Sequence, residues 1–225
     1  FLFNTLNSIS TLVLLKQTEP ANAMLTRLSS FLRHTLVSQP GGKVTVLQEV
    51  ETLKLYLDIE RMRFEERLRT VFRIDPAAAG AMIPSLLLQP LVENAIKYAV
   101  SPQEEGARIS LTAQVLGNRL RLIVADTGPG LHARASDRRY EHGPDGHVST
   151  GVGLANIRNR LAQAYGDEHR FEIQTPPEGG FTVIIEMPFE ATEGPRDPIS
   201  AGTKPASPQN IDPLLPGDRA IGTSA

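Results

Sequence analysis

Residues 108–128 read RISLTAQVLGNRLRLIVADTG, and their pattern indicates what kind of sheet this protein builds. Apolar and polar residues alternate on both sides of Gly117-Asn118, and two alternating runs joined by a short Gly/Asn turn are typical of an antiparallel hairpin. In the second run Leu120, Leu122 and Val124 share one face, which we expect to point into a core. Asp126 is in phase with them, so a carboxylate is also aimed at the apolar layer.

The segments on either side of this hairpin alternate irregularly between helical and strand patterns. Residues 47–67 form a helical pattern that Thr45 and Gln48 open as a capping box, and residues 68–75 alternate like a strand. Residues 84–100 return to a helical pattern, with Pro84 suited to its first turn and Pro90 expected to kink it. Downstream, residues 153–166 predict a helix and residues 170–189 a closing hairpin.

Most of the expected strands are joined by hairpins and not by helical crossovers. This favours an α+β fold over a doubly wound parallel sheet. We therefore expect a two-layer α/β sandwich, in which a mixed, mainly antiparallel sheet carries its helices on one face.

The first 40 residues predict a separate helical hairpin. Apolar residues recur three or four apart in two runs on either side of a break, TEPANA (residues 18–23). The hairpin leaves its apolar seam exposed, so it either pairs with a second copy of itself or packs against the rest of the chain. The runs are Leu2, Leu6, Ile9 and Val13, then Leu25, Leu28, Leu32 and Leu36.

Composition changes after Glu190, where Pro, Gly, Ser and Ala dominate and aromatic residues are absent. Such a segment cannot bury enough apolar surface to fold, so we expect a disordered tail. The expected domains are a helical hairpin at 1–40, a catalytic domain at 41–189 and the tail at 190–225.

Charge and residue content exclude several classes of function. The net charge of −2 argues against nucleic-acid binding, which requires a basic surface. The chain has no cysteine, which excludes disulfides, thiolate metal sites and cysteine nucleophiles. No run reaches the roughly 18 apolar residues of a membrane span. Because the sequence opens in a helical pattern without Met, we interpret it as a piece of a longer protein.

Three short motifs are candidates for chemistry. In ENAIKY (93–98), Asn94, Lys97 and Tyr98 share a helix face and offer a hard oxygen ligand, an ammonium and an aromatic ring. This pattern alone is more typical of an ordinary solvated helix face, with Glu93 and Lys97 as an ion pair.

The second motif is DTGPGL (126–131). A core-facing Asp126 is costly unless a group donates a hydrogen bond to it, and a base with an exocyclic amine is such a donor. Gly128 and Gly130 allow the backbone to turn sharply against a ligand. The same residues are also typical of a simple turn at the end of a strand.

The third motif is STGVGLANI (149–157), in which Gly151 and Gly153 precede a helix whose free N–H groups can hold phosphate. No strand precedes this G-x-G-x-x-N pattern, so it is not a Rossmann fingerprint. Between the second and third motifs lies a polar stretch without periodicity, residues 131–149, and a loop of that length inside a compact domain is usually functional or mobile.

Together and in this order, the motifs resemble the N, G1 and G2 boxes of the ATP-binding domain shared by histidine kinases, gyrase B, Hsp90 and MutL. The flanking sequences FLFNTLNSI, LSSFLRHTL, LYLDIERMRFEERL and IPSLLLQPLVENAIKY resemble the LytS/YehU-type sensor histidine kinases over nearly all of residues 1–189. The resemblance implies a Bergerat-type (GHKL) ATP-binding domain and a protein-histidine kinase.

The resemblance also implies roles for the motif residues toward ATP and Mg²⁺. Asp126 is expected to accept a hydrogen bond from the adenine amine, with Gly128 and Gly130 shaping that end of the pocket. Asn94 is expected to hold the Mg²⁺ that bridges the phosphates.

The remaining contacts are expected around the phosphates. By resemblance, Lys97 and the loop of Gly151 and Gly153 steady the phosphate charge, Leu154 lies beside them, and Tyr98 lines the site.

In the family the phosphoacceptor histidine directly precedes the residues matching Phe1. This chain is therefore expected to carry the ATP machinery of a kinase and to lack the acceptor, so that alone it does not autophosphorylate. None of its own histidines suits that role: His34, His132, His142, His147 and His169.

The implied partners are a second copy of the chain and the receiver domain of a response regulator, whose aspartate takes the phosphoryl group. The implied location is cytoplasmic, with membrane anchorage only through segments upstream of Phe1. Whether the phosphoryl group passes within one subunit or between two stays open.

Two alternatives are a degenerate scaffold that dimerises without kinase activity and an ATP-driven machine of the gyrase or MutL sort. Intact motifs argue against the first. Pro90 argues against the second, because it stands where gyrase-type relatives place a water-activating Glu. One departure from the family is Phe181 after Gly179-Gly180, where members often have Thr, which puts a polar contact near the adenine in doubt.

Overall fold

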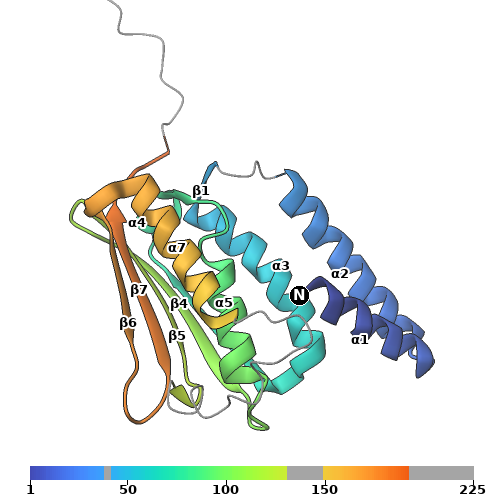
Figure 1. The fold of residues 1–225 in the computed structure, drawn as a ribbon. Helices are drawn as coiled ribbons and strands as arrows, with labels where there is room; N and C mark the ends of the chain where they lie inside the picture. Colours follow the sequence, from blue (N-terminus) through green and yellow to red (C-terminus); the bar gives the residue numbers. More distant parts are fainter. Residues whose placement is uncertain (38–41, 131–148, 193–225) are drawn as a thin grey trace, which may run out of the picture. The chain divides into compact units, whose positions relative to one another are not determined.

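The computed structural model describes residues 1–37, 42–130 and 149–192. Its centre is a five-stranded sheet in the order β2-β4-β5-β7-β6, in which β2 and β4 are parallel and the other pairs are antiparallel (Figure 1). A short two-stranded sheet, β1-β3, lies apart from it. The strands are β1 (Lys43–Thr45), β2 (Leu68–Ile74), β3 (Met82–Pro84), β4 (Ala107–Leu116), β5 (Arg119–Asp126), β6 (Arg170–Gln174) and β7 (Phe181–Pro188).

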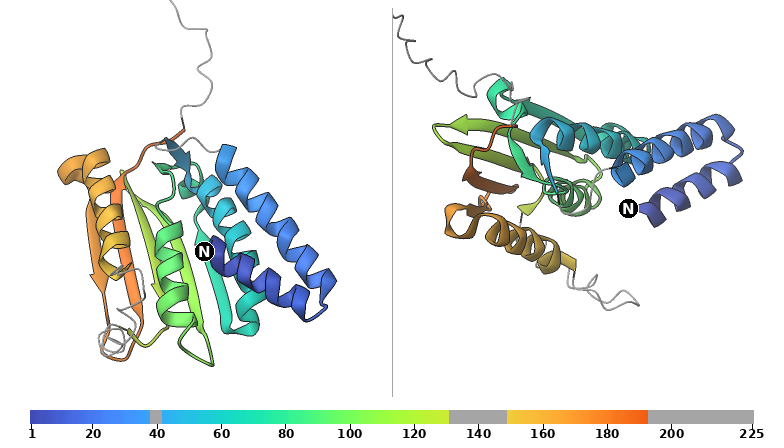
Figure 2. Two further views of the ribbon diagram at one scale, coloured as in Figure 1. Left: turned by 45° about the vertical axis from the view of Figure 1, so that its right-hand side comes forward. Right: turned by 90° about the horizontal axis from the view of Figure 1, so that it is seen from above.

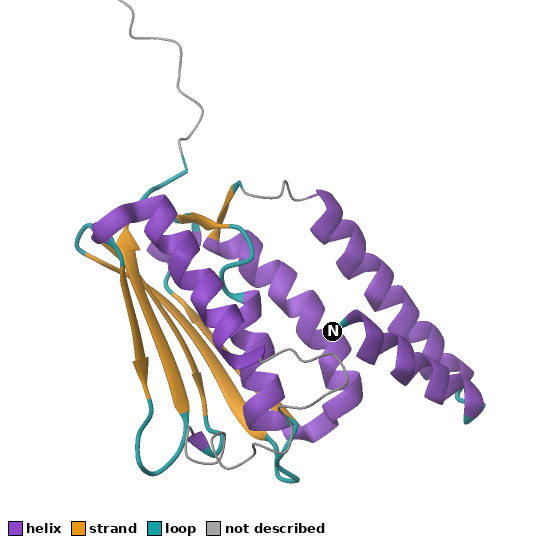
Figure 3. Cartoon of the chain, viewed as in Figure 1, coloured by secondary structure: helices purple, strands orange, loops and turns teal. Residues whose placement is uncertain are grey.

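The predicted α+β class with a mainly antiparallel sheet is confirmed, and the helices lie on one side of the sheet (Figure 3). Along β5, Leu120, Leu122 and Val124 are buried while the residues between them are partly exposed, as the alternation predicted. The helices are α1 (Leu2–Leu14), α2 (Thr18–Val37), α3 (Val46–Phe64), η1 (Glu65–Arg67), α4 (Pro76–Ala79), α5 (Gln89–Ala95), η2 (Ile96–Val100), α7 (Ser149–Tyr165) and η4 (Gly166–Glu168).

Helix α3 begins where its capping box predicted. The Thr45 side chain accepts a hydrogen bond from the Gln48 backbone N–H at 3.1 Å, and the Gln48 side chain accepts one from the Thr45 N–H at 2.9 Å. Two backbone N–H groups that have no acceptor within the helix are thereby hydrogen-bonded. Helix α3 packs between α2 and the sheet, which explains why its buried residues include two carboxylates, Glu49 and Glu60.

The predicted helix over residues 84–100 is wrong in its first five residues. Pro84 ends β3, which pairs with β1, and α5 begins only at Gln89. Pro90 does not kink the helix but lies in its first turn, where its missing N–H costs nothing. The segment between them turns sharply at Leu86, which has a positive φ of 57°. From Ile96 the helix continues as a π-helical turn, η2.

The amino-terminal hairpin is present, but its turn lies earlier than predicted. Residues 15–17 join α1 to α2, with Lys16 at φ 59°, and TEPANA forms the start of α2 and not a break. Pro20 is tolerated because it lies in the first turn of α2. In two further views α2 runs along α3, and α1 lies against α2 with only its start close to α3 (Figure 2).

The two predicted apolar runs divide between the core and the surface. Ile9 and Leu28 are buried against the rest of the chain, whereas Leu6, Val13 and Leu25 are 50%, 60% and 43% exposed. Most of the first run therefore remains uncovered in one copy of the chain. Across the described ranges, no helix is both long and apolar enough to cross a membrane.

Two expectations fall outside the described residues: the polar loop up to residue 148 and the tail from residue 193. The predicted helix after the loop starts four residues early, at Ser149, so Gly151 and Gly153 lie within the first turns of α7 and not before it.

Candidate functional site

Asn94 lies near the end of α5, half-buried, on the side of that helix that meets α7. A Cβ placed on Gly153 would lie 3.6 Å from the Asn94 side-chain nitrogen. The first and third motifs are therefore adjacent in space, although Asn94 and Gly153 are 59 positions apart in the sequence. The surroundings of Gly151 are not described, and Leu154 is partly buried against the core.

The second motif begins at the end of β5, where Asp126 is 6% exposed and faces the helices. Its Oδ1 accepts a hydrogen bond from the Gly128 backbone N–H at 2.9 Å. A buried carboxylate held in this way suits a ligand that donates a further hydrogen bond.

The turn after Asp126 packs directly on the box helix (α5 and η2, which carry the first motif) because Gly128 has no side chain. A Cβ at that position would lie 2.3 Å from the Ala99 Cβ, far inside van der Waals contact. On its other side the Gly128 carbonyl accepts a hydrogen bond from the Gly180 N–H at 2.7 Å. Gly130, at φ 72°, approaches Gly179 and Gly180 in the same turn. The Gly179-Gly180 pair therefore supports the second motif.

The other two residues of the first motif lie in η2, one turn beyond Asn94. Lys97 is exposed and its Nζ lies 4.9 Å from the centroid of the Tyr98 ring, while Tyr98 is half-buried. The change from α to π geometry at Ile96 alters the spacing of this face, and such turns are frequent at functional sites.

The start of α5 is set by a buried carboxylate that sequence analysis did not identify. Glu49 of α3 accepts hydrogen bonds from the backbone N–H groups of Leu86 and Leu88 at 2.9 and 3.0 Å. Burial raises the pKa of the Glu49 carboxyl, and these N–H groups oppose the rise. From α7, Arg160 donates to the carbonyls of Ser85 and Leu86. The segment before α5 is therefore held by both neighbouring helices.

The site offers few metal ligands. The described ranges contain no cluster of three or more His, Asp or Glu side chains able to hold a metal ion. The Asn94 amide oxygen is a hard donor of the type Mg²⁺ accepts, and Mg²⁺ commonly keeps waters and substrate phosphates as its other ligands. One such donor beside a helix start fits an ion carried in with a phosphate group.

Comparison with known proteins gives two family matches. Residues 1–68 match the family described as histidine kinase, and residues 82–191 match the family described as histidine kinase-, DNA gyrase B- and HSP90-like ATPase. The two matches together contain all three motifs and the amino-terminal hairpin.

Individual relatives agree with these matches. The chain is 34% identical over 196 residues to the sensor protein LytS of Enterococcus faecalis, covering 86% of this chain and 33% of that protein. It is 34% identical over 188 residues to the sensor histidine kinase YesM of Bacillus subtilis, covering 84% of this chain and 31% of that protein. The chain thus spans about a third of the length of the curated relatives it matches.

Among solved structures, the catalytic domain of histidine kinase ThkA is similar with a TM-score of 0.48 and 17% identity, covering 67% of this chain and 96% of that one.

Proposed function

Because the chain belongs to the sensor histidine kinase family, we propose that it is the ATP-binding catalytic part of a two-component kinase. It transfers the γ-phosphoryl group of ATP to a histidine immediately upstream of Phe1, from which an aspartate of a response regulator receives it. The observation that carries this proposal is the convergence of three separate motifs around one helix, α5–η2.

In this function the motif residues bind and orient the nucleotide. Asp126, already fixed by the Gly128 N–H, accepts a hydrogen bond from the adenine amine. Gly128 and Gly130 bring the turn close enough to the helix to enclose the base. The contact with Gly179-Gly180 is made through the backbone, so Phe181 in place of a polar residue does not disturb it.

The phosphate end of the nucleotide lies between helices α5 and α7. Asn94 is the residue that would hold Mg²⁺, and a bound Mg²⁺ supplies charge neutralisation on the β- and γ-phosphates. Lys97 places an ammonium one turn away, and the free N–H groups in the first turn of α7, including that of Gly151, favour an anion. Gly153 lies in the next turn and, having no side chain, lets α7 approach Asn94. Leu154 and Tyr98 exclude water from the sides of the phosphate site. Positioning and charge stabilisation are the main sources of rate in phosphoryl transfer.

We extend the proposal to the organisation of the intact protein. Residues 1–40 form the dimerisation and phosphotransfer hairpin, residues 41–189 the catalytic domain and residues 190–225 a tail. The exposed apolar residues of α1 support a homodimer, because a second copy of the hairpin would cover them. By analogy with sensor kinases, this part is cytoplasmic in a membrane-anchored protein.

The test is to incubate a chain that continues upstream through the acceptor histidine with ATP labelled on its γ-phosphate. We expect label on the protein that acid removes and base does not, as for a phosphoramidate. Replacing the acceptor histidine with Gln is the matched control and should abolish labelling. Release of free phosphate without labelled protein would favour an ATP-driven machine, and absence of nucleotide binding would favour a scaffold.

A further inference from the structure

Helix α7 meets the box helix and the turn before it at two separate places. Near the start of α7, Gly153 lies beside Asn94, toward the end of α5. Further along, the Arg160 guanidinium donates hydrogen bonds to the Ser85 and Leu86 carbonyls, ahead of the start of α5. The two helices therefore run in opposite directions. Gly153 and Arg160 are seven positions apart, about two helical turns, so both contacts lie on one face of α7, roughly 10 Å apart along its axis.

The contact near the start of α7 does not by itself fix the spacing of the two helices. Gly153 has no side chain, and an added Cβ would lie 3.6 Å from the Asn94 side-chain nitrogen, an ordinary contact distance. Ile157 and Leu161 are buried in the core, but apolar packing is not directional. The two hydrogen bonds of Arg160 are directional, and a planar guanidinium presents them in a fixed geometry. They therefore define where α7 lies along the box helix.

The turn that Arg160 holds is itself firmly placed. Leu86 has a φ of 57°, which is uncommon for a residue other than glycine, and it is 40% exposed, so side-chain burial does not maintain this conformation. Hydrogen bonds to the backbone maintain it instead. The Leu86 N–H donates to Glu49 of α3 at 2.9 Å, and the Ser85 N–H donates to the Gly42 carbonyl at 3.0 Å. Strained backbone persists only where several contacts determine it together, and such turns cluster at functional sites.

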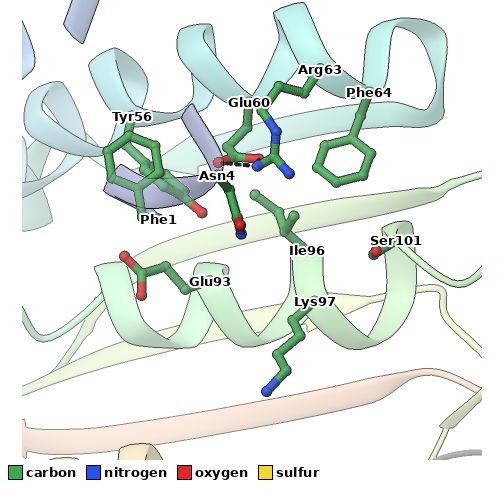
Figure 4. Close-up of a pocket in the computed structure, with 10 residues that line it drawn as sticks. All are labelled: Phe1, Asn4, Tyr56, Glu60, Arg63, Phe64, Glu93, Ile96, Lys97 and Ser101. Atoms are coloured by element: carbon green, nitrogen blue, oxygen red, sulfur yellow. Dashed lines mark hydrogen bonds and ion pairs between the residues drawn. The ribbon is translucent and has the colours of Figure 1, made fainter. Parts of the chain in front are cut away.

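On the side that faces α3, the box helix is incompletely packed. A pocket of about 200 Å³ separates part of it from α3 and from the start of α1 (Figure 4). Side chains that border a cavity lack van der Waals partners on that side. The position of the box helix therefore depends on the turn at its start. The residues that line the pocket include Phe1, Asn4, Glu60, Arg63, Glu93 and Lys97.

From this arrangement we propose that Arg160 is a positioning residue for the phosphates of the bound nucleotide. By joining α7 to the turn before α5, it fixes the width of the gap between Asn94 and the start of α7. This inference rests on the proposed function, which places the phosphates in that gap. Arg160 lies about two turns from Gly153, and its guanidinium is engaged by backbone carbonyls, so it acts through α7 and not on the nucleotide.

The adenine end of the proposed site is held by different elements. Asp126 ends β5 and accepts a hydrogen bond from the Gly128 N–H, and the Gly128 carbonyl accepts one from the Gly180 N–H. These contacts join the sheet to the turn that follows it, and they are made without α7. Loss of the Arg160 hydrogen bonds is therefore expected to weaken binding of the phosphates and to spare binding of the base.

Titrations of Arg160→Ala with ATP and with adenosine test the proposal, because adenosine has the base of ATP without its phosphates. We expect the affinity for ATP with Mg²⁺, measured by calorimetry, to fall by about tenfold or more, since two hydrogen bonds are lost. The affinity for adenosine, measured by NMR titration, should remain that of wild type. Arg160→Lys keeps the charge but not the planar pair of donors, so it should lose less ATP affinity. It carries the same comparison if the Ala variant does not fold.

Arg158→Ala is the matched control on the same helix. Arg158 is exposed, and its guanidinium carbon lies 5.0 Å from the centroid of the Phe171 ring of β6. The variant removes the same charge from α7 and should leave both affinities unchanged. An equal fall in ATP affinity in Arg158→Ala and Arg160→Ala would mean that α7 attracts ATP only through its positive charge, which would overturn the proposal.

Two further results would contradict the positioning role. Wild-type ATP affinity in Arg160→Ala would show that its hydrogen bonds do not set the gap for the phosphates. An equal loss of ATP and adenosine affinity would show that Arg160 maintains the whole site and not its phosphate end. In both cases wild type still binds ATP and the proposed function stands. A wild type that binds neither ligand refutes the proposed function, and this inference with it.

Discussion

Replacing Gly128 with Ala tests how the second motif is joined to the box helix. Gly128 is buried, and an added Cβ would lie 2.3 Å from the Ala99 Cβ and 2.7 Å from its Cα. Carbon atoms prefer separations of about 3.5–4.0 Å, so the turn and the helix must move apart by roughly 1 Å. The Gly180 N–H bond to the Gly128 carbonyl holds the turn from the other side and resists that movement.

The cost of this insertion can be bounded. Forcing one extra methyl group into a packed region costs about 1–3 kcal/mol. For a folded domain of this size that corresponds to a fall in melting temperature of roughly 2–12 °C. Because the displaced turn begins at Asp126, we also expect ATP affinity to fall by about tenfold or more, which is about 1.4 kcal/mol.

Thermal unfolding and calorimetric ATP titration measure the two effects. Gly117→Ala is the matched control, since Gly117 has a φ of 63° and nothing within 4 Å of an added Cβ. It should cost about 1 kcal/mol of stability and leave ATP affinity unchanged. The double variant Gly128→Ala with Ala99→Gly should recover only part of the loss, because the backbone of residue 99 still lies too close to the added methyl group. Wild-type stability and affinity in Gly128→Ala would refute the close packing of the turn on the helix.

Three further predictions concern α3. Glu49→Gln should lower the free energy of unfolding by about 1–3 kcal/mol in urea denaturation, because the amide nitrogen that replaces one carboxylate oxygen cannot accept from the backbone N–H facing it; an unchanged midpoint contradicts this. Burial raises the pKa of the Glu60 carboxyl in the folded protein above its usual 4.5. The stability that this group contributes is therefore fully present below pH 4.5 and is lost as the pH rises through the folded-state pKa. Between pH 4.5 and neutrality, the free energy of unfolding should therefore fall more in wild type than in Glu60→Gln. Parallel profiles of unfolding free energy against pH in the two proteins would contradict this prediction. Thr45→Ala should cost about 1 kcal/mol by removing one arm of the capping box with Gln48, with exposed Thr11→Ala as a control that changes little.

The elements that local pattern specifies were predictable from the sequence. The hairpin around Gly117 follows from alternation and turn chemistry, the start of α3 follows from its capping box, and the burial of Asp126 follows from its phase with the apolar residues of β5. In each case the information lies within about ten residues of the feature that it determines.

The features set by distant residues were not predictable. The start of α5 depends on Glu49, whose hydrogen bonds reach 37 and 39 residues along the chain, so the apolar run after Pro84 was misread as helix. The turn before α2 was misplaced because Pro20 is typical of a break as well as of a first helical turn. Glu60 and Arg63 show only an i,i+3 spacing in the sequence, and nothing in their local pattern indicates that Phe1 and Asn4 line the same pocket.

The most direct measurement is a calorimetric titration of this chain with ATP, with and without Mg²⁺, in wild type and Asp126→Asn. The substitution keeps an oxygen that can accept the Gly128 N–H, so the fold and melting temperature should be retained. Wild type should show saturable binding at one site, strengthened by Mg²⁺, and Asp126→Asn should show none. If Asp126→Asn binds ATP as tightly as wild type, the nucleotide does not lie where the three motifs converge.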